Sequence, residues 1–341
     1  MKYYSSKTIF FIATFALVAL FFSACENESS NNDNDKMLVD QENIKVKVPK
    51  FDGNSAKEFV AKQVSFGTRV TGSAGHQKCK DWLVSQFKSF GAKVIEQDFT
   101  AITFNNVKLN ATNIIARYNP TIKERIILSA HYDTRPFADK DPDPLRQSDP
   151  ILGADDAGSG VGVLLEIAKL LQSNPIPMGV DIVLFDAEDY GDAESNNPDS
   201  WGLGSQHWSK NPHLKRANVK YGILLDMVGA KDAKFYKEGY SVNYAGVLTN
   251  KIWQLAASMK KDNFFINSVG GAITDDHYFV MMKDFRMPMV DIINMPSENF
   301  GFGPHWHTHG DNMEVIDAKT LEAVGQVVTA VVYKESNKEF L

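Results

Sequence analysis

The sequence is poor in cysteine and has no excess of positive charge. Only two of its 341 residues are cysteines, and the formal net charge is −6 with no long block of either sign. The sequence therefore lacks the excess of basic residues typical of nucleic-acid-binding proteins, and it has no charged tail that would suggest an interaction segment. What the chain does have is an ordinary apolar fraction of 43%, enough to bury a core in one α/β domain.

The N-terminal segment differs in kind from the rest. Lys2 and Lys7 precede the apolar run "IFFIATFALVALFF", and the small residues Ser23 and Ala24 stand directly before Cys25. This order predicts a bacterial lipoprotein signal over residues 1–24, with the lipid attached to Cys25. The alternative is a plain transmembrane anchor, but the run is short of the roughly 20 residues that span a bilayer.

A polar stretch, "ENESSNNDNDK", follows Cys25 and lacks the apolar residues that a core needs. We expect residues 25–45 to form a flexible tether and residues 46–341 to form a single catalytic domain. Once Cys25 is acylated, no internal disulfide can form. Cys79 lies in a helical pattern and is expected to be a small core residue rather than a nucleophile.

Apolar strand patterns alternate with amphipathic helices along the domain. Helices are expected around residues 56–66, 76–90, 160–171, 248–260 and 318–334, and strands at 113–118, 125–133, 180–189, 220–229 and 288–294. The strands are apolar nearly throughout, as strands covered on both faces must be. The pattern predicts a three-layer α/β/α sandwich with a largely parallel, mixed central sheet. Two long loops, Arg135–Leu152 and Tyr190–Asp199, are candidates for functional segments.

Three of the apolar strands end in acids or a histidine. "LSAHYD" contains His131 and Asp133, "VLFDAED" contains Glu188 and Asp189, and "ILLDMVG" contains Asp226. Ligands of open α/β sheets bind at the carboxyl ends of the strands, so these side chains are expected to converge there.

Further candidate donors lie in three other segments: Asp155 and Asp156 in "GADDAGSG", Asp275 and Asp276 in "TDDHYF", and His305, His307 and His309 in "HWHTHGDN". The set offers carboxylate and imidazole donors and no thiolate. Such donors suit Zn²⁺ in a catalytic site with three protein ligands and an open position.

Taken singly, each of these residues also has an ordinary structural explanation. Asp156 could cap the following helix, and Glu188 with Asp189 could be a solvated strand end. His131 could be a hydrogen-bonded core histidine, while His305 and His309, in a glycine-flanked turn, are expected to be solvated. Convergence of all of them at one edge of a sheet favours the metal site. Glu188 and Asp189 would then have different roles: one would bind the metal and the other would act as general acid/base.

The motifs "AHYDTRPF", "GADDAGSGVGVLLEIA", "VLFDAEDYG", "LLDMVGA", "DDHYF" and "WHTHGDN" together resemble the zinc exopeptidase clan, and within it the animal-type glutaminyl cyclases. The similarity runs from about Phe59 to the C-terminus. It implies one zinc ion per chain, on Asp156, Asp189 and His307. It also implies Glu188 as general acid/base, Asp226 and Asp275 as a carboxylate network that holds Glu188 and the substrate amine, and Trp201 and Trp306 as pocket walls.

The sequence departs from the animal cyclases in two places. They carry two consecutive glutamates where this chain has Glu188-Asp189, so the shorter Asp189 needs a closer approach of the backbone to the metal. The spacing from Asp189 to Trp201 also differs, which affects the role expected for Trp201. His131 occupies the position at which aminopeptidases of the clan bind a second metal, and the cyclases retain this position without a second ion.

The resemblance implies cyclisation of N-terminal Gln on peptides and proteins to pyroglutamate, with release of ammonia. Two other functions stay open. A di-zinc aminopeptidase would use His131 and Asp226 for a second ion, and a non-catalytic binding lipoprotein would need no general base. With Cys25 as its anchor, the protein is expected on the periplasmic or cell-surface face of a bacterial membrane.

Overall fold

The computed structural model describes residues 45–195, 197–295 and 301–341, which form one compact unit, Lys45–Leu341. The predicted signal segment, Cys25 and nearly all of the predicted tether lie outside the described residues. No helix within the described ranges is long and apolar enough to cross a membrane.

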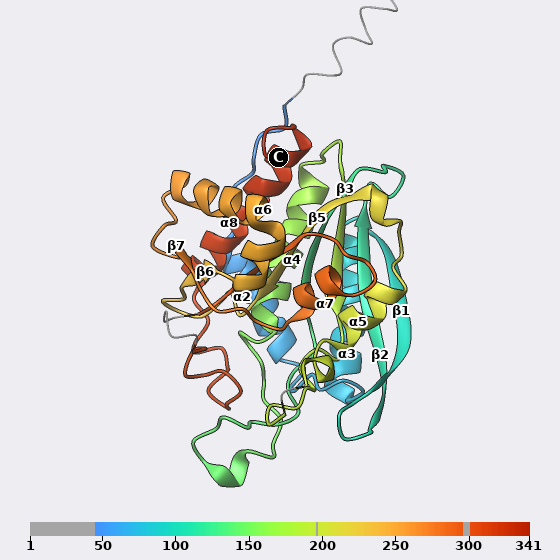
Figure 1. The fold of residues 1–341 in the computed structure, drawn as a ribbon, viewed down its shortest axis with the longest axis vertical. Coiled ribbons are helices and arrows are strands. Elements are labelled where there is room, and N and C mark those ends of the chain that lie inside the picture. Colours follow the sequence, from blue (N-terminus) through green and yellow to red (C-terminus); the bar gives the residue numbers. More distant parts are fainter. Residues whose placement is uncertain (1–44, 196, 296–300) are drawn as a thin grey trace, which may run out of the picture. The chain divides into compact units, whose positions relative to one another are not determined.

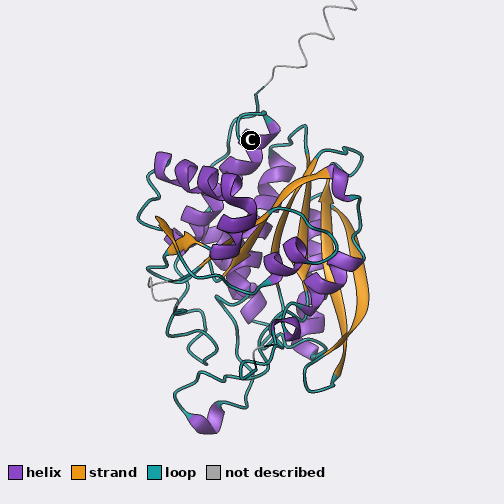
Figure 2. Ribbon diagram, in the orientation of Figure 1, coloured by secondary structure: helices purple, strands orange, loops and turns teal. Residues whose placement is uncertain are grey.

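A six-stranded sheet runs through the middle of this unit (Figures 1 and 2). Its strand order is β1-β2-β4-β3-β5-β8. The four strands from β4 to β8 are mutually parallel, whereas β2 runs antiparallel to both of its neighbours, β1 and β4. The expectation of a largely parallel, mixed sheet is confirmed. The bounds are β1 Lys93–Ile102, β2 Lys108–Tyr118, β3 Arg125–His131, β4 Gly179–Phe185, β5 Val219–Asp226 and β8 Met289–Ile293; β6 Phe235–Lys237 and β7 Phe265–Val269 form a separate pair.

The helices begin and end where local sequence signals indicate. The Asp52 and Ser73 side chains cap the first two helices of the described residues by accepting backbone N–H bonds. Gly91, with φ of 82°, follows the second helix in the left-handed conformation that glycine tolerates. The bounds are α2 Gly53–Val64, α3 Ala74–Ser89, α4 Gly158–Ser173, α5 Leu203–Lys210, α6 Gly239–Ser258, α7 Asp276–Met282 and α8 Ala318–Ser336, with short 3₁₀ turns at Pro144–Arg146, Pro198–Ser200 and Arg216–Asn218.

Alternate residues of the strands belong to two separate hydrophobic cores, because successive side chains of a strand point to opposite faces of the sheet. Ile126 and Leu128 of β3 belong to the larger core, which the helices α2, α3, α4, α6 and α8 cover. Ile127 of the same strand belongs to a smaller core on the other face, beneath Trp208 of α5 and Val280 of α7. Figure 1 shows α5 and α7 lying over this second face. The three-layer architecture is therefore confirmed.

Several elements differ from the sequence-based expectation. Strands β3 and β4 end at His131 and Phe185, earlier than expected, so Asp133 and Glu188 lie in the loops beyond them. The edge strand β1 was not predicted, since its exposed and half-buried residues lack the apolar run of the central strands. The helices α5 and α7 are short and were also missed.

Candidate active site

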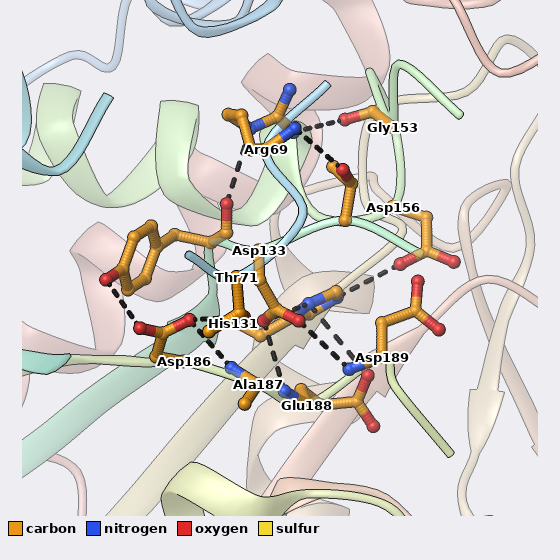
Figure 3. A network of polar contacts seen from close by, with 12 residues as sticks. Arg69, Thr71, His131, Asp133, Gly153, Asp156, Asp186, Ala187, Glu188 and Asp189 are labelled. Atoms are coloured by element: carbon orange, nitrogen blue, oxygen red, sulfur yellow. Dashed lines mark hydrogen bonds and ion pairs between the residues drawn. The ribbon is translucent and has the colours of Figure 1, made fainter. Parts of the chain in front are cut away.

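The candidate site lies at the carboxyl ends of the parallel strands. His131 and Asp226 are the last residues of β3 and β5, and Glu188 and Asp189 follow the end of β4. Asp156 stands just before α4. In Figure 3 the carboxylates of Asp156, Glu188 and Asp189 all point to the same side of the network around His131. The predicted convergence of these side chains is present in the structure.

Asp156, Asp189 and His307 form a buried group of potential metal donors, with one atom of each within 4.8 Å of the others. His307 Nε2 lies 3.3 Å from Asp189 Oδ1 and 3.8 Å from Asp156 Oδ2. Tetrahedral Zn²⁺ with bonds of about 2.0–2.1 Å would separate its ligand atoms by roughly 3.3 Å. Asp189 Oδ2 is buried and has no hydrogen-bond partner among the residues that the structure describes. The donor types, their spacing and this free oxygen all fit a zinc ion.

A second group shares Asp156 with the first. His131 Nε2 lies 3.0 Å from Asp156 Oδ1 and 3.3 Å from Asp226 Oδ1, the latter with hydrogen-bond geometry. This is the position expected for the second ion of an aminopeptidase. In the structure the Nε2 atom of His131 is hydrogen-bonded to Asp226, whereas its buried Nδ1 has no hydrogen-bond partner among the described residues.

A cavity of about 280 Å³ opens beside the first donor group. Its acidic side includes Glu188, Asp226 and Asp275 together with the candidate metal donors. Its apolar side includes Trp201, Trp306 and Phe302, so both predicted tryptophan walls line it. The Trp306 ring stacks on His307 with a centroid separation of 3.8 Å, and the Trp201 ring lies 6.2 Å from the same imidazole.

The carboxyl groups of this cavity have perturbed pKa values. Burial raises the pKa of Glu188 well above its ordinary value; His131 opposes this rise, and the negative charges of Asp275 and Asp189 reinforce it. Burial also raises the pKa of Asp226, to about 8, although the bond from His131 lowers it. Burial also acts to raise the pKa of Asp156, but the hydrogen bond and the charge of His131 outweigh it and lower the pKa below its usual range. The pKa of one acid is thus lowered beside neighbouring acids whose pKa is raised.

Two further aspartates fix the backbone that carries the donors. The Asp133 carboxylate accepts the N–H groups of Glu188 and Asp189, at 3.1 and 3.2 Å (Figure 3). The Asp311 carboxylate accepts those of Asp155 and Asp156, at 2.7 and 3.1 Å. Each acid holds a pair of consecutive residues, which orients their side chains. Asp311 stands in the "HWHTHGDN" motif, yet sequence alone gave no sign of this role.

Several expectations for single residues are corrected by the structure. His305 is not solvated: it is 9% exposed and its Nε2 lies 2.9 Å from Asp155 Oδ2. His309 is half-buried and pairs with Asp141. The same "HWHTHGDN" turn is packed against the acidic loops, which supply partners for each imidazole. The alternative of Asp156 as a helix cap fails, because α4 has Ala157 at its N-cap and no side-chain cap bond.

The expected network around Glu188 is only partly visible. Asp226 contacts His131, whose Nδ1 lies 3.9 Å from Glu188 Oε2. Asp275 lines the cavity, and its Oδ1 accepts a hydrogen bond from the backbone N–H of Asp276. Its buried Oδ2 has no partner within the described ranges. Glu188, Asp226 and Asp275 therefore share one cavity, and the imidazole of His131 stands between the first two.

The chain belongs to peptidase family M28, which residues 113–332 match. Among solved structures, the glutaminyl cyclase of Porphyromonas gingivalis is 49% identical, with a TM-score of 0.80 over 84% of this chain and 98% of that chain. A Zn-dependent exopeptidase from Parabacteroides distasonis is 47% identical, with a TM-score of 0.82 over 84% and 99%.

An aminopeptidase of Bacillus subtilis is 29% identical over 239 residues, which is 69% of this chain. That stretch covers 46% of the aminopeptidase, so the chain spans about half the length of this relative.

Proposed function

We propose that this chain is a zinc-dependent glutaminyl-peptide cyclotransferase, which converts the N-terminal Gln of peptides and proteins to pyroglutamate and releases ammonia. The observation that carries the proposal is the position of Glu188, a buried acid on the wall of the cavity next to the group Asp156, Asp189 and His307. The similarity to the Porphyromonas gingivalis cyclase supports the same activity.

Asp156, Asp189 and His307 would hold the zinc ion. When bound, zinc supplies Lewis-acid polarisation of the carbonyl of the glutamine side chain. These three residues leave the cavity side of the site open, which allows a substrate oxygen to approach.

Glu188 moves the proton in this proposal. Its carboxylate takes a proton from the substrate α-amine, whose nitrogen attacks the side-chain amide carbon of the same residue. The bond from that carbon to the amide nitrogen then breaks, and Glu188 returns the proton to the departing ammonia. A group that both accepts and donates a proton works best with a pKa near the working pH, and burial moves the pKa of Glu188 in that direction.

The other cavity residues would hold the substrate. Asp226 and Asp275 lie on the acidic side, where they can bind the α-amine. Trp201 and Trp306 offer flat apolar surfaces that suit the amide side chain of Gln. The reaction is intramolecular, so positioning of the amine near the carbonyl accounts for part of its rate.

We propose one zinc ion per chain, as the resemblance to the glutaminyl cyclases implies; the group His131, Asp156 and Asp226 is the position that a second ion would take. Metal analysis of the purified protein tests this. We expect one zinc per chain, lost in Asp189→Ala and kept in Asp226→Asn. Absence of zinc from the wild-type protein would overturn the proposed mechanism.

A di-zinc aminopeptidase is the second candidate, favoured by the group His131, Asp156 and Asp226 and by the similarity to the Bacillus aminopeptidase. Two zinc ions per chain, one of them lost in Asp226→Asn, would support it.

For the rest of the chain we propose a lipoprotein signal over residues 1–24, a lipidated Cys25 with a tether to residue 45, and a single catalytic domain over 46–341. The protein would then face the periplasm or the cell exterior. Metabolic labelling with a fatty acid tests this: the wild-type chain should incorporate the label and Cys25→Ala should not. An unlabelled wild-type chain would contradict the proposal.

A further inference from the structure

We propose that the ion pair between Arg135 and Asp139 is a positioning device for the metal centre, holding Asp189 and His307 at the spacing that zinc requires. The inference rests on the proposed zinc site. It gives the loop Arg135–Leu152 a role in metal binding that the sequence did not suggest.

Asp139 acts on His307. Its Oδ1 lies 3.2 Å from His307 Nδ1, the ring nitrogen that faces away from Asp156 and Asp189. A carboxylate beside Nδ1 favours the tautomer with the proton on that nitrogen, which leaves the lone pair of Nε2 for the metal position. Oδ1 of Asp139 also accepts a hydrogen bond of 2.5 Å from Arg135 Nε, which fixes the carboxylate itself.

Arg135 acts on Asp189. Its Nη1 donates to the backbone carbonyls of Asp189 and Gly191, at 3.1 and 3.2 Å, and lies 3.5 Å from Asp189 Oδ1. Oδ2 of Asp189 has no hydrogen-bond partner in the described part of the chain. The guanidinium is buried and lies 4.8 Å from the Trp201 ring. The planar guanidinium group of Arg135 therefore contacts both Asp189, a proposed metal ligand, and Trp201, which lines the cavity.

Asp189 and His307 need such support because neither residue belongs to a helix or strand, which would otherwise hold it in place. Asp189 lies in the loop after β4, and His307 is held in a turn with a φ of 55°. The base of the Arg135–Leu152 loop fastens this turn in two further places: Lys140 N–H donates to His307 O at 3.2 Å, and Asp141 accepts the His309 N–H at 2.9 Å.

The outer part of the loop forms hydrogen bonds with the base of the loop and, among the described residues, with neither Asp189 nor His307. Residues 142–150 are all exposed, among them Asp143, whose side chain accepts only a local bond from the Leu145 N–H. Asp143 therefore provides a matched control, an aspartate of the same loop without a contact to the ligands.

The test is the zinc dissociation constant, measured by competition with a chelator, for the wild type, Asp139→Asn, Arg135→Lys and Asp143→Asn. Partners of metal ligands typically contribute 10–100-fold to metal affinity. We expect a weakening of about 10–100-fold in Asp139→Asn, a smaller one in Arg135→Lys, which keeps the charge but not the fork, and none in Asp143→Asn.

Two further readouts separate positioning from a general structural role. The loss of zinc affinity should exceed what any fall in the melting temperature of the metal-free protein accounts for, and the Co²⁺-substituted Asp139→Asn protein should have altered d–d absorption at saturating metal. A zinc affinity equal to wild type in Asp139→Asn would overturn the inference alone. A fall in the metal-free melting temperature that accounts for the whole loss of affinity would also overturn it. Failure of the wild type to bind zinc would overturn the proposed function as well.

Discussion

Glu188 and Asp189 are neighbours in the chain, yet their carboxylates face different parts of the cavity. Asp133 binds both backbone N–H groups and so fixes the turn that separates the two side chains. Asp189 points to His307, whereas Glu188 stands beside His131. This local arrangement allows one residue to bind metal while the other carries a proton.

Replacement of Glu188 by Gln should remove proton transfer and leave the metal donors in place. We expect kcat to fall by roughly 10²–10⁴ in Glu188→Gln, the usual range for general acid–base catalysis, with zinc content unchanged. Steady-state kinetics on a Gln-initiated peptide, together with metal analysis, measure both. Glu194→Gln, an exposed glutamate of the following loop, is the control and should keep wild-type kcat. Full activity of Glu188→Gln would refute the assignment.

At the scale of elements, the loop after β4 carries both a proposed ligand and a cavity wall. Gly191 lies directly against the Trp201 indole: a Cβ added at Gly191 would meet ring atoms at 1.9–2.4 Å. The lack of a side chain at Gly191 is therefore what allows Trp201 to occupy its position beside His307.

Gly191→Ala should displace Trp201 and disturb the site. We expect kcat/KM for a Gln-initiated peptide to fall by up to about 10²-fold, since small misplacements of positioning groups can have effects of that size. The control is Gly246→Ala in α6, where an added Cβ meets nothing within 4 Å. Unchanged kcat/KM in Gly191→Ala would mean that Trp201 does not contribute to substrate binding.

The sheet below the site depends on a buried charge cluster across three strands. Asp181 of β4 accepts hydrogen bonds from Arg125 of β3, at 2.5 and 2.7 Å, and from Arg117 of β2 at 3.2 Å. Burial would raise the pKa of Asp181, but the hydrogen bonds from His213 and Arg125 outweigh it and lower the pKa. A depressed pKa in the folded state stabilises the fold above the unfolded pKa and loses this effect as the pH falls.

Asp181→Asn should therefore lower the free energy of unfolding near pH 7, by about 3–5 kcal/mol, because Arg125 is left buried without its counter-charge. The difference from wild type should shrink below about pH 4, where the unfolded-state carboxyl of the wild type becomes protonated. Denaturant unfolding between pH 3 and pH 8 measures this. Asp284→Asn, an exposed aspartate, should follow the wild type throughout. A constant difference over the whole range would contradict the role given to the Asp181 charge.

At the scale of the whole molecule, the sequence predicted the features that depend on periodicity. The parallel strands were recognisable because they are apolar on both faces, and the positions of His131, Glu188 and Asp226 at their ends predicted that these residues meet. Strand β1 and the helices α5 and α7 were not recognisable, since their half-exposed or short patterns are like those of loops.

The supporting contacts of the site could not be predicted either. Asp139, Asp311 and Arg135 act through contacts between segments far apart in the chain, and no spacing along one segment encodes such a contact. His305 was misjudged for the same reason, since its partner Asp155 is 150 residues away. Local sequence predicts which elements form, whereas the partners of a loop side chain depend on how the loops pack.

The most direct test of the central claim is a mass-spectrometric assay of the domain over residues 46–341 with two peptides in parallel, one beginning with Gln and one with Leu. We predict loss of one ammonia from the Gln peptide, no change in the Leu peptide, and complete loss of the reaction after treatment with a chelator, restored by zinc. Release of free leucine from the second peptide, with the Gln peptide left uncyclised, would contradict the account and would identify an aminopeptidase.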